Sequence, residues 1–158
     1  MTYDSRPETY EHIRLVQHHL NEVIRLLLER AEQHDASKLK PPELAVFDEA
    51  TPKLRDLLYG SDEYRAALKD MRVGLDHHYA VNSHHPEHFV DGILGMTLLD
   101  LTELICDWMA ATQRMEGGDI IKSLEVNQKR FGYGDELARV LLNTVHVLEF
   151  QGGESWDS

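Results

Sequence analysis

Residues that can bind a metal ion occur in three groups along this sequence. The first group is His34-Asp35, in which a histidine and an aspartate leave adjacent backbone positions. An imidazole nitrogen and a carboxylate oxygen this close can coordinate one ion or bridge two. We expect His12 to join this pair, with His18 and His19 as the alternatives on the same predicted helix. The spacing alone does not decide between two roles for His12: a metal ligand, or a histidine at the start of a helix that hydrogen-bonds with solvent or with a cap.

The second group lies between His77 and His88, a stretch that holds five of the ten histidines. His78 continues a 4-3-4-3 spacing of apolar positions, so it should face inward while His77 turns toward solvent. His84 and His85 fall in a predicted loop before Pro86. One buried histidine is usually structural, but this clustering favours contact with a metal or a substrate.

The third group is an acidic stripe on a predicted long helix. Asp100, Glu103 and Asp107 follow spacings of three and four among apolar residues. A carboxylate in such surroundings is costly to ionise unless a cation or a hydrogen-bond donor accompanies it. We therefore favour a ligand role for Asp107, the alternative being the solvated face of an amphipathic helix.

Helical periodicity recurs along the chain, whereas strand alternation and hairpin turns are nearly absent. We therefore predict an all-α fold, a single-domain helical bundle with the metal site in its core. The loop is expected at 80–86, between helices predicted at about 7–32, 34–40, 43–47, 61–78, 90–115, 119–129 and 135–150.

Length and composition predict a single cytoplasmic domain. The 158 residues suit one core, which we place at about 7–150 with a loose tail at 151–158. No apolar run approaches 18 residues, so we expect no membrane partner, and the polar start lacks a secretory signal. The only cysteine, Cys106, fits a reducing compartment, which would be the host cytoplasm for a phage-encoded protein.

The net charge of −12 argues against binding to nucleic acid polymers, because such binding depends on Lys and Arg contacts to phosphates. A small anionic substrate remains compatible with this charge if a metal ion supplies positive charge locally. Lys122, Asn127 and Arg130 have spacings that could face one pocket and hold such an anion. A solvated polar face explains them at least as well.

The order His12, His34-Asp35 and Asp107 resembles the H…HD…D pattern of the HD-domain superfamily. The resemblance implies a divalent metal inside a helical bundle and, in most members, hydrolysis of phosphate esters. Lys38 stands where mononuclear nucleotidases of the superfamily often have Glu. His-Asp-x-x-Lys instead resembles the two-metal branch, which includes cyclic-dinucleotide phosphodiesterases, diadenosine tetraphosphate hydrolases and inositol oxygenases. That branch supplies extra histidines between the HD pair and the last Asp.

A closer resemblance, covering most of the chain, is to a family of bacterial and phage proteins related to HD domains. It rests on three motifs: His34-Asp35-x-Ser37-Lys38 followed by Glu43, His78-x-x-x-Asn82-x-His84-His85-Pro86, and Glu103-x-x-x-Asp107-Trp108. These motifs support the fold and the metal site and say little about the substrate.

Together these observations predict a metal-dependent phosphohydrolase that acts on a nucleotide or a related small phosphate ester through a metal-activated water. One or two ions of Fe, Mn, Co, Ni or Zn are expected. A di-iron oxygenase of the HD type and a non-catalytic nucleotide-binding protein are the alternatives, and a homo-oligomer is left open. The expected metal ligands are His12, His34, Asp35, His78, His85 and Asp107; the expected catalytic residues are Lys38, Glu43, His78 and His84; the expected substrate contacts are Lys38, Asn82, Lys122, Asn127 and Arg130.

Two of the expected catalytic residues have alternative roles. Lys38 would neutralise charge on the phosphate, or it is a surface lysine in a salt bridge. Glu43 would be a base or an outer partner of a ligand, or it is a charge placed at a helix N-terminus after Pro41-Pro42.

Overall fold

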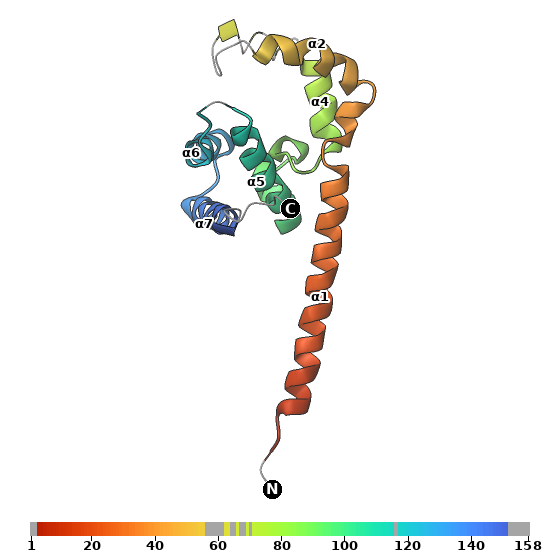
Figure 1. Cartoon of the computed structure of the whole chain (residues 1–158), viewed down its shortest axis with the longest axis vertical. Helices are drawn as coiled ribbons and strands as arrows, with labels where there is room; N and C mark the ends of the chain where they lie inside the picture. The colour runs from red at the N-terminus through yellow and green to blue at the C-terminus, as the bar shows by residue number, and fades with distance from the viewer. Residues whose placement is uncertain are drawn as a thin grey trace, which may run out of the picture. The chain divides into compact units, whose positions relative to one another are not determined.

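The computed structural model describes residues 3–55, 62–63, 66, 69, 71–115 and 117–151. Helices and short turns account for these residues, and no strand occurs among them (Figure 1), which confirms the all-α class. The sequence predicts one domain, but the chain divides into two compact units, Met1–His34 and Asp35–Ser158. No helix in the described part of the chain has both the length and the apolar character needed to cross a bilayer.

The first unit is one long helix, α1 (Arg6–Gln33), which agrees with the predicted 7–32. Pro7 lies in its first turn, where a helix tolerates proline because the missing N–H would have no partner there. Arg25 forms ion pairs with Glu22 at 3.1 Å and Glu29 at 2.5 Å along one polar face. No residue of α1 is buried.

The second unit begins with η1 (Ala36–Leu39), α2 (Glu43–Arg55) and α4 (Arg72–Val81), and α2 packs against both of the others. α2 extends eight residues beyond the predicted end at residue 47, with Pro52 inside it. Gly74 lets α2 and α4 approach closely, because a Cβ atom there would lie 2.9 Å from Cγ1 of Val46. Tyr64 and Leu68, which define the predicted helix at 61–78, lie outside the described residues.

The helix predicted at 90–115 is wrong at its start. The segment forms two short turns, η2 (Pro86–His88) and η3 (Gly92–Gly95), before α5 (Leu98–Gln113). A capping box begins α5: the Asp100 amide donates to Oγ1 of Thr97 at 3.2 Å, and the Thr97 amide donates to Oδ2 of Asp100 at 2.8 Å. Asp100 also accepts from Oγ of Ser83 at 2.7 Å, so its carboxylate is a buried cap and not part of a ligand stripe.

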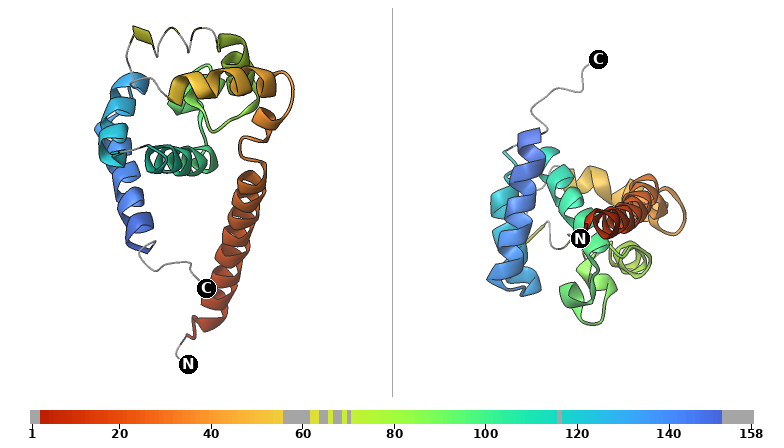
Figure 2. Two further views of the ribbon diagram at one scale, coloured as in Figure 1. Left: turned by 45° about the horizontal axis from the view of Figure 1, so that its top comes forward. Right: turned by 90° about the horizontal axis from the view of Figure 1, so that it is seen from below.

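The core of this unit lies between α5, α6 (Ile120–Phe131) and α7 (Asp135–Gln151), which contact one another. Figure 2 gives two further views of these helices. Asp119 caps α6 by accepting from the amides of Ile121 and Lys122. The Trp108 and Phe131 rings stack with centroids 6.1 Å apart, which joins α5 to the end of α6. The most buried apolar side chains of this core are Leu104, Ile105, Leu141 and Val145.

Candidate metal centre

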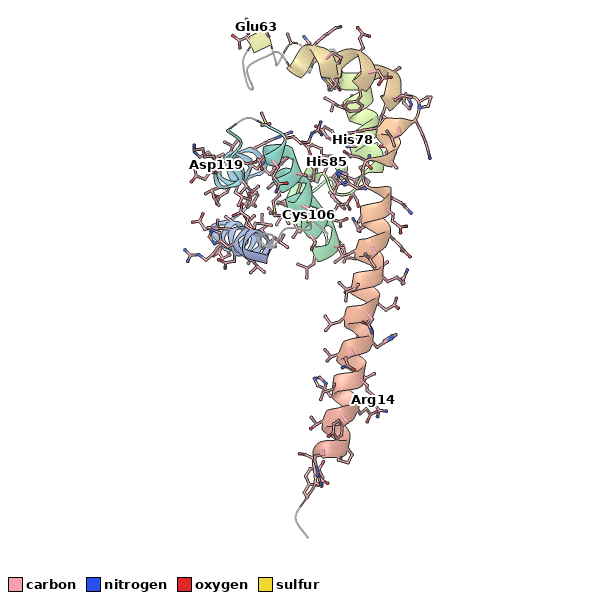
Figure 3. All side chains as sticks on the ribbon, in the orientation of Figure 1. Arg14, Glu63, His78, His85, Cys106 and Asp119 are labelled. Atoms are coloured by element: carbon pink, nitrogen blue, oxygen red, sulfur yellow. The ribbon has the colours of Figure 1, made fainter. Side chains whose placement is uncertain are left out.

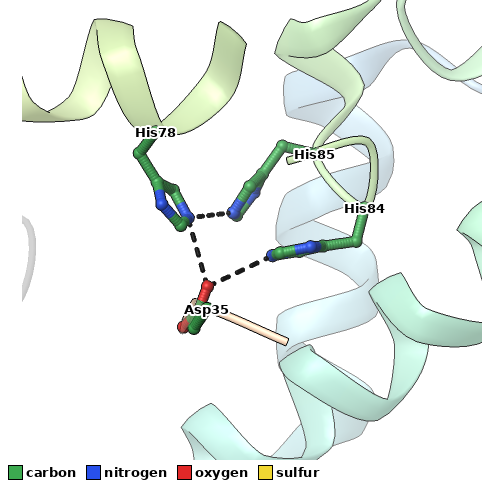
Figure 4. Close-up of side chains that lie close together, drawn as sticks. All are labelled: Asp35, His78, His84 and His85. Carbon is green, nitrogen blue, oxygen red and sulfur yellow. Dashed lines mark hydrogen bonds and ion pairs between the residues drawn. The ribbon is translucent and has the colours of Figure 1, made fainter. Parts of the chain in front are cut away.

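Four predicted site residues of the second unit converge on one point. The Nε2 atom of His78 lies 3.3 Å from Oδ1 of Asp35, and Nε2 of His84 lies 3.5 Å from the same oxygen. The Nε2 atoms of His78 and His85 are 2.9 Å apart. Figure 4 shows the three imidazoles and the carboxylate turned toward one another. We call this set the His3Asp cluster.

Local structure places each of these donors. His78 lies in the last turn of α4, and His84 and His85 follow in the segment that ends at Pro86, the first residue of η2 (Figure 3 labels His78 and His85). Asp35 stands immediately before η1 with φ at +57°, a left-handed conformation that aspartate adopts more readily than most residues. This conformation turns its carboxylate toward the histidines.

The spacing of the His3Asp cluster fits one transition-metal ion. Arms of about 2.0–2.1 Å in a tetrahedral site place neighbouring ligand atoms about 3.3–3.4 Å apart. Three of the separations between cluster atoms are 2.9, 3.3 and 3.5 Å, and all four atoms lie within 4.8 Å of one another. Imidazole nitrogens suit zinc, iron, copper and nickel, whereas magnesium and calcium prefer all-oxygen sites. The donor set therefore fits a borderline transition metal.

A fully buried carboxylate supports His78 from behind. Glu43, the first residue of α2, has no exposed surface. Its Oε2 lies 2.9 Å from Nδ1 of His78 and accepts from Oγ of Ser37 at 3.0 Å, while its Oε1 lies 2.7 Å from Nδ1 of His77. Because both oxygens are engaged and shielded, the geometry does not support the predicted role of Glu43 as a general base.

His84 has an acidic partner of its own. Its Nδ1 lies 3.1 Å from Oε1 of Glu103, one turn before Asp107 on α5. Carboxylates that hold the second nitrogen of a ligand histidine fix its orientation and are typical of metal sites. His84, which the sequence predicts to be catalytic, thus has the surroundings of a metal ligand.

Charge in the His3Asp cluster is distributed unevenly. Burial disfavours the charged carboxylate of Asp35, but its contacts with His78, His84 and Lys38 outweigh burial and hold its pKa far below the ordinary value. Burial likewise disfavours a charged His84, yet Asp35 and Glu103 raise its pKa to about 9. His85 has a pKa lowered to about 3, first by burial and then by the positive charges of its neighbours. A neutral imidazole is therefore already available at His85 near pH 7.

Two further predicted residues contact the cluster from the side. Nζ of Lys38 donates to Oδ2 of Asp35 at 2.5 Å and lies 5.4 Å from the centre of the Phe47 ring. Asp107, half-buried on α5, offers a carboxylate oxygen within 4.8 Å of one from Asp35. The carboxylate of Asp35 thus lies between the three histidines, a cation and a second acid.

The predicted joint ligand set of His12 with Asp35 is wrong for a single chain. α1 is continuous, and a helix rises about 1.5 Å per residue, so His12 lies about 33 Å from His34, the residue bonded to Asp35. His34 is the C-cap of α1 and the last residue of the first unit. Its role as a ligand stays a prediction.

Of the residues predicted to hold an anionic substrate, the structure brings Arg130 toward the histidine segment. Its guanidinium donates to Oε1 of Glu87 at 2.6 Å and hydrogen-bonds Tyr79, whose ring packs 5.0 Å from that of His85. Lys122 pairs at 3.4 Å with Asp119, the N-cap of its own helix.

The two predicted amide contacts have partners nearby. Asn127 donates to Ser123 at 3.3 Å on the same helix. Asn82 donates to Oγ of Ser37 at 2.9 Å and to the carbonyl of His78 at 2.8 Å, so its amide stabilises the end of α4. A substrate contact through Asn82 is therefore not supported.

Sequence reasoning missed His77 and Tyr79. His77 was expected to face solvent, and its side chain is 41% exposed, but its Nδ1 is directed at Glu43. Tyr79 is part-buried between His85 and Arg130. Both residues flank His78, so adjacency to an inward-facing histidine was the only signal.

A family model described as a family of unknown function (DUF5662) matches residues 1–151. The chain belongs to this family. No curated protein matches the chain significantly, and no solved structure does either. Within this DUF5662 chain, the His3Asp cluster, Glu43, Asn82 and Glu103 all fall in the matched region.

Proposed function

We propose that this protein is a metal-dependent phosphohydrolase of the HD type whose ion binds at the His3Asp cluster. The observation that carries the proposal is the convergence of three imidazoles and one carboxylate, whose ligand atoms all lie within 4.8 Å of one another and in three pairs lie 2.9–3.5 Å apart. Such a donor set fits one divalent transition metal, and a water or a substrate would bind as a fifth ligand beside the four protein donors.

A bound divalent ion would lower the pKa of a water molecule and polarise a phosphoryl oxygen. The chain's own residues would hold the reactants in place. Once the ion displaces the proton of His84, the three histidines would supply neutral donors without adding negative charge, so the anionic substrate would meet a site that carries only Asp35 as a direct acidic ligand. Asp107, close to Asp35, would bind a second ion if the site is dinuclear.

Two cations beside the cluster support an anionic substrate. Nζ of Lys38 pairs with Oδ2 of Asp35, the carboxylate oxygen that does not face the histidines. From there the ammonium would contact a phosphoryl oxygen while it stays paired with the carboxylate. Arg130 is anchored through Glu87 and Tyr79, next to His85. Elsewhere the excess of acidic residues, 28 against 16 basic ones, repels phosphates, so productive binding depends on these local charges and on the ion.

The test combines metal analysis with a substrate panel. The purified full chain is freed of metal and equilibrated separately with zinc, manganese, cobalt or ferrous iron. Bound metal is then measured by mass spectrometry, and phosphate release is measured on nucleoside mono-, di- and triphosphates. Asp35→Asn keeps the shape of the side chain and removes its charge. Asp48→Asn, at an exposed position on α2, is the matched control.

We expect at least one ion per chain and metal-dependent phosphate release, both lost in Asp35→Asn and kept in Asp48→Asn. Stoichiometric metal in the wild type without hydrolysis of any nucleotide would contradict the phosphohydrolase. Equal metal content in Asp35→Asn and the wild type would contradict the site.

A further inference from the structure

Glu43 occupies an unusual position for an acidic residue. It is the first residue of α2, where the helix N-terminus favours negative charge, and no part of it reaches solvent. A buried carboxylate is costly unless donors surround it. Its three partners are Ser37 and the adjacent histidines His77 and His78.

The hydrogen-bond donors around Glu43 determine the tautomer of His78. The amide of Asn82 places its two N–H groups on Oγ of Ser37 and on the carbonyl of His78. Ser37 in turn donates its hydroxyl proton to Oε2 of Glu43 at 3.0 Å. Nδ2 of Asn82 and Oγ of Ser37 also lie 3.0 and 3.3 Å from Nδ1 of His78, but with their hydrogens on these other acceptors neither has one left for Nδ1. The contact of Nδ1 with Oε2 of Glu43 at 2.9 Å therefore requires the proton to lie on Nδ1.

A proton on Nδ1 leaves the lone pair of His78 on Nε2. That atom faces the rest of the His3Asp cluster, at 3.3 Å from Oδ1 of Asp35 and 2.9 Å from Nε2 of His85. The opposite tautomer would put a hydrogen where an ion has to bind. The tautomer set by Glu43 thus decides whether His78 can act as a ligand.

His77 keeps Glu43 from turning away. Its Nδ1 lies 2.7 Å from Oε1, so the two carboxylate oxygens are held by two neighbouring residues of α4. The close packing of α2 on α4 at Gly74 and Val46 sets the distance between the helices that carry these groups.

We propose that Glu43 is a positioning residue for the metal site: its buried carboxylate, held by His77 and Ser37, presents Nε2 of His78 to the ion. This inference rests on the metal site of the proposed function and not on phosphate hydrolysis. It assigns Glu43 no contact with the substrate.

The decisive variant is Glu43→Gln in the full chain. Glutamine has the same shape, but its NH2 group must point at one of the groups that donate hydrogen bonds to Glu43 in the wild type. If that group faces His78, it donates to Nδ1 and forces the hydrogen onto Nε2. Glu49→Gln, at an exposed position on the same helix, is the matched control. Zinc affinity is measured by competition with a chromophoric chelator, folding by circular dichroism, and the tautomer of His78 in the metal-free protein by ¹⁵N NMR of its imidazole.

We expect the wild type and Glu49→Gln to show His78 protonated on Nδ1 and to bind zinc equally. Glu43→Gln should bind zinc about 10- to 100-fold more weakly, the usual effect of losing such a partner. Its imidazole signals should shift to the Nε2–H form, and the visible spectrum of bound cobalt should change.

Unchanged zinc affinity in folded Glu43→Gln, or an Nε2–H tautomer in the wild type, would overturn the inference. If Glu43→Gln does not fold, His77→Ala decides, because that side chain is partly exposed and its loss releases Oε1. A loss of several-fold in zinc affinity is then expected, and unchanged affinity overturns the proposal. A wild type that binds no zinc refutes the metal site along with this inference. Zinc binding weakened by Glu43→Gln, without hydrolysis in any variant, supports the inference and refutes only the phosphohydrolase.

Discussion

Asp35 combines a backbone requirement with a charge requirement. Its φ of +57° lies in the left-handed region, which few residues other than glycine, asparagine and aspartate adopt readily. Its Oδ1 faces His78 and His84, and its Oδ2 accepts from Lys38. Replacement by asparagine keeps the backbone and removes the charge, whereas replacement by a branched residue would disturb both.

His85 should matter for metal binding and His88 should not. His85 contributes Nε2 to the His3Asp cluster, whereas His88 is exposed and its Nδ1 contacts the carbonyl of Tyr79 at 2.9 Å. Loss of a residue that only orients a ligand typically lowers metal affinity about 10- to 100-fold. We expect His85→Ala to lower zinc affinity by more than that. His88→Ala should stay within a factor of two. Isothermal titration of both variants measures this, and equal affinities would remove His85 from the ligand set.

At the level of single residues, the sequence predicts the members of the His3Asp cluster better than their hydrogen-bond partners. Helical spacing correctly places His78 inward, and the clustering of histidines identifies His84 and His85. The links from Glu43 to His77 and His78 span 34 and 35 residues, and such separations leave no trace in local spacing.

The contact between α2 and α4 aligns Glu43, on α2, with His77 and His78, on α4. Val46 follows Glu43 by one helical turn, and Gly74 precedes His78 by one turn. A change at Gly74 should therefore act on the metal site without touching any ligand.

Gly74→Ala tests this coupling. Alanine is favoured over glycine in a helix by about 1 kcal/mol, so helix propensity alone would stabilise the variant. The added Cβ lies 2.9 Å from Cγ1 of Val46, and α2 must shift to accept it. We expect zinc affinity to fall several-fold, with little change in the control Val73→Ala, whose side chain is exposed. Zinc titration of both variants is the measurement, and wild-type affinity in Gly74→Ala would show that the helix spacing does not govern the site.

Tyr133 links α6 to the loop before α7 and makes the stability of the fold depend on pH in the alkaline range. Its hydroxyl donates to the carbonyl of Leu124 at 3.1 Å, and burial raises its pKa to about 12. The unfolded chain ionises this phenol near pH 10, so its contribution to stability is complete below pH 10 and is lost as the pH rises to about 12.

Tyr133→Phe should therefore change the pH profile of stability. Loss of the hydrogen bond should lower the free energy of unfolding by about 1 kcal/mol at pH 8. The advantage of the wild type should vanish and reverse as the pH rises from 10 to 12, because ionisation of the unfolded phenol costs the wild type about 1.4 kcal/mol per pH unit and phenylalanine does not ionise. Urea unfolding at several pH values gives both quantities. A constant difference across this range would contradict the raised pKa.

Helix positions could be predicted from the sequence, but the starts of some could not. α1, α6 and α7 agree with their predicted ranges within about two residues, since Pro7, Asp119 and the Gly132 turn mark their ends clearly. The start of α5 was misplaced by eight residues, because apolar periodicity continues through η3 while Thr97 and Asp100 form the actual cap.

At the scale of the whole chain, α1 is a unit of its own. Its continuous 28 residues carry His12, His18 and His19 far from its C-terminal end. The prediction of His12 as a ligand rests on the HD pattern and on its place at the edge of an apolar stripe, and neither takes account of the distance along the helix that the sequence predicts at 7–32.

His12→Ala should leave metal binding by the chain unchanged. The residue lies about 33 Å along α1 from His34, which exceeds any reach of its side chain. We expect zinc affinity within a factor of two of the wild type in His12→Ala and equally in the control His19→Ala. A tenfold loss confined to His12→Ala would mean that another copy of the chain supplies this histidine.

The order of the ligands along the chain has a consequence for how the ion is acquired. His78, His84 and His85 lie within eight consecutive residues, so closing the loop between them costs little entropy even in an unfolded chain. With the proposed site, this segment would chelate a transition metal before the core has formed. An unfolded ensemble that also binds the ion would make added metal stabilise the native protein less than its native affinity implies. Capture would precede folding, and the metal present during synthesis would decide which ion the protein carries.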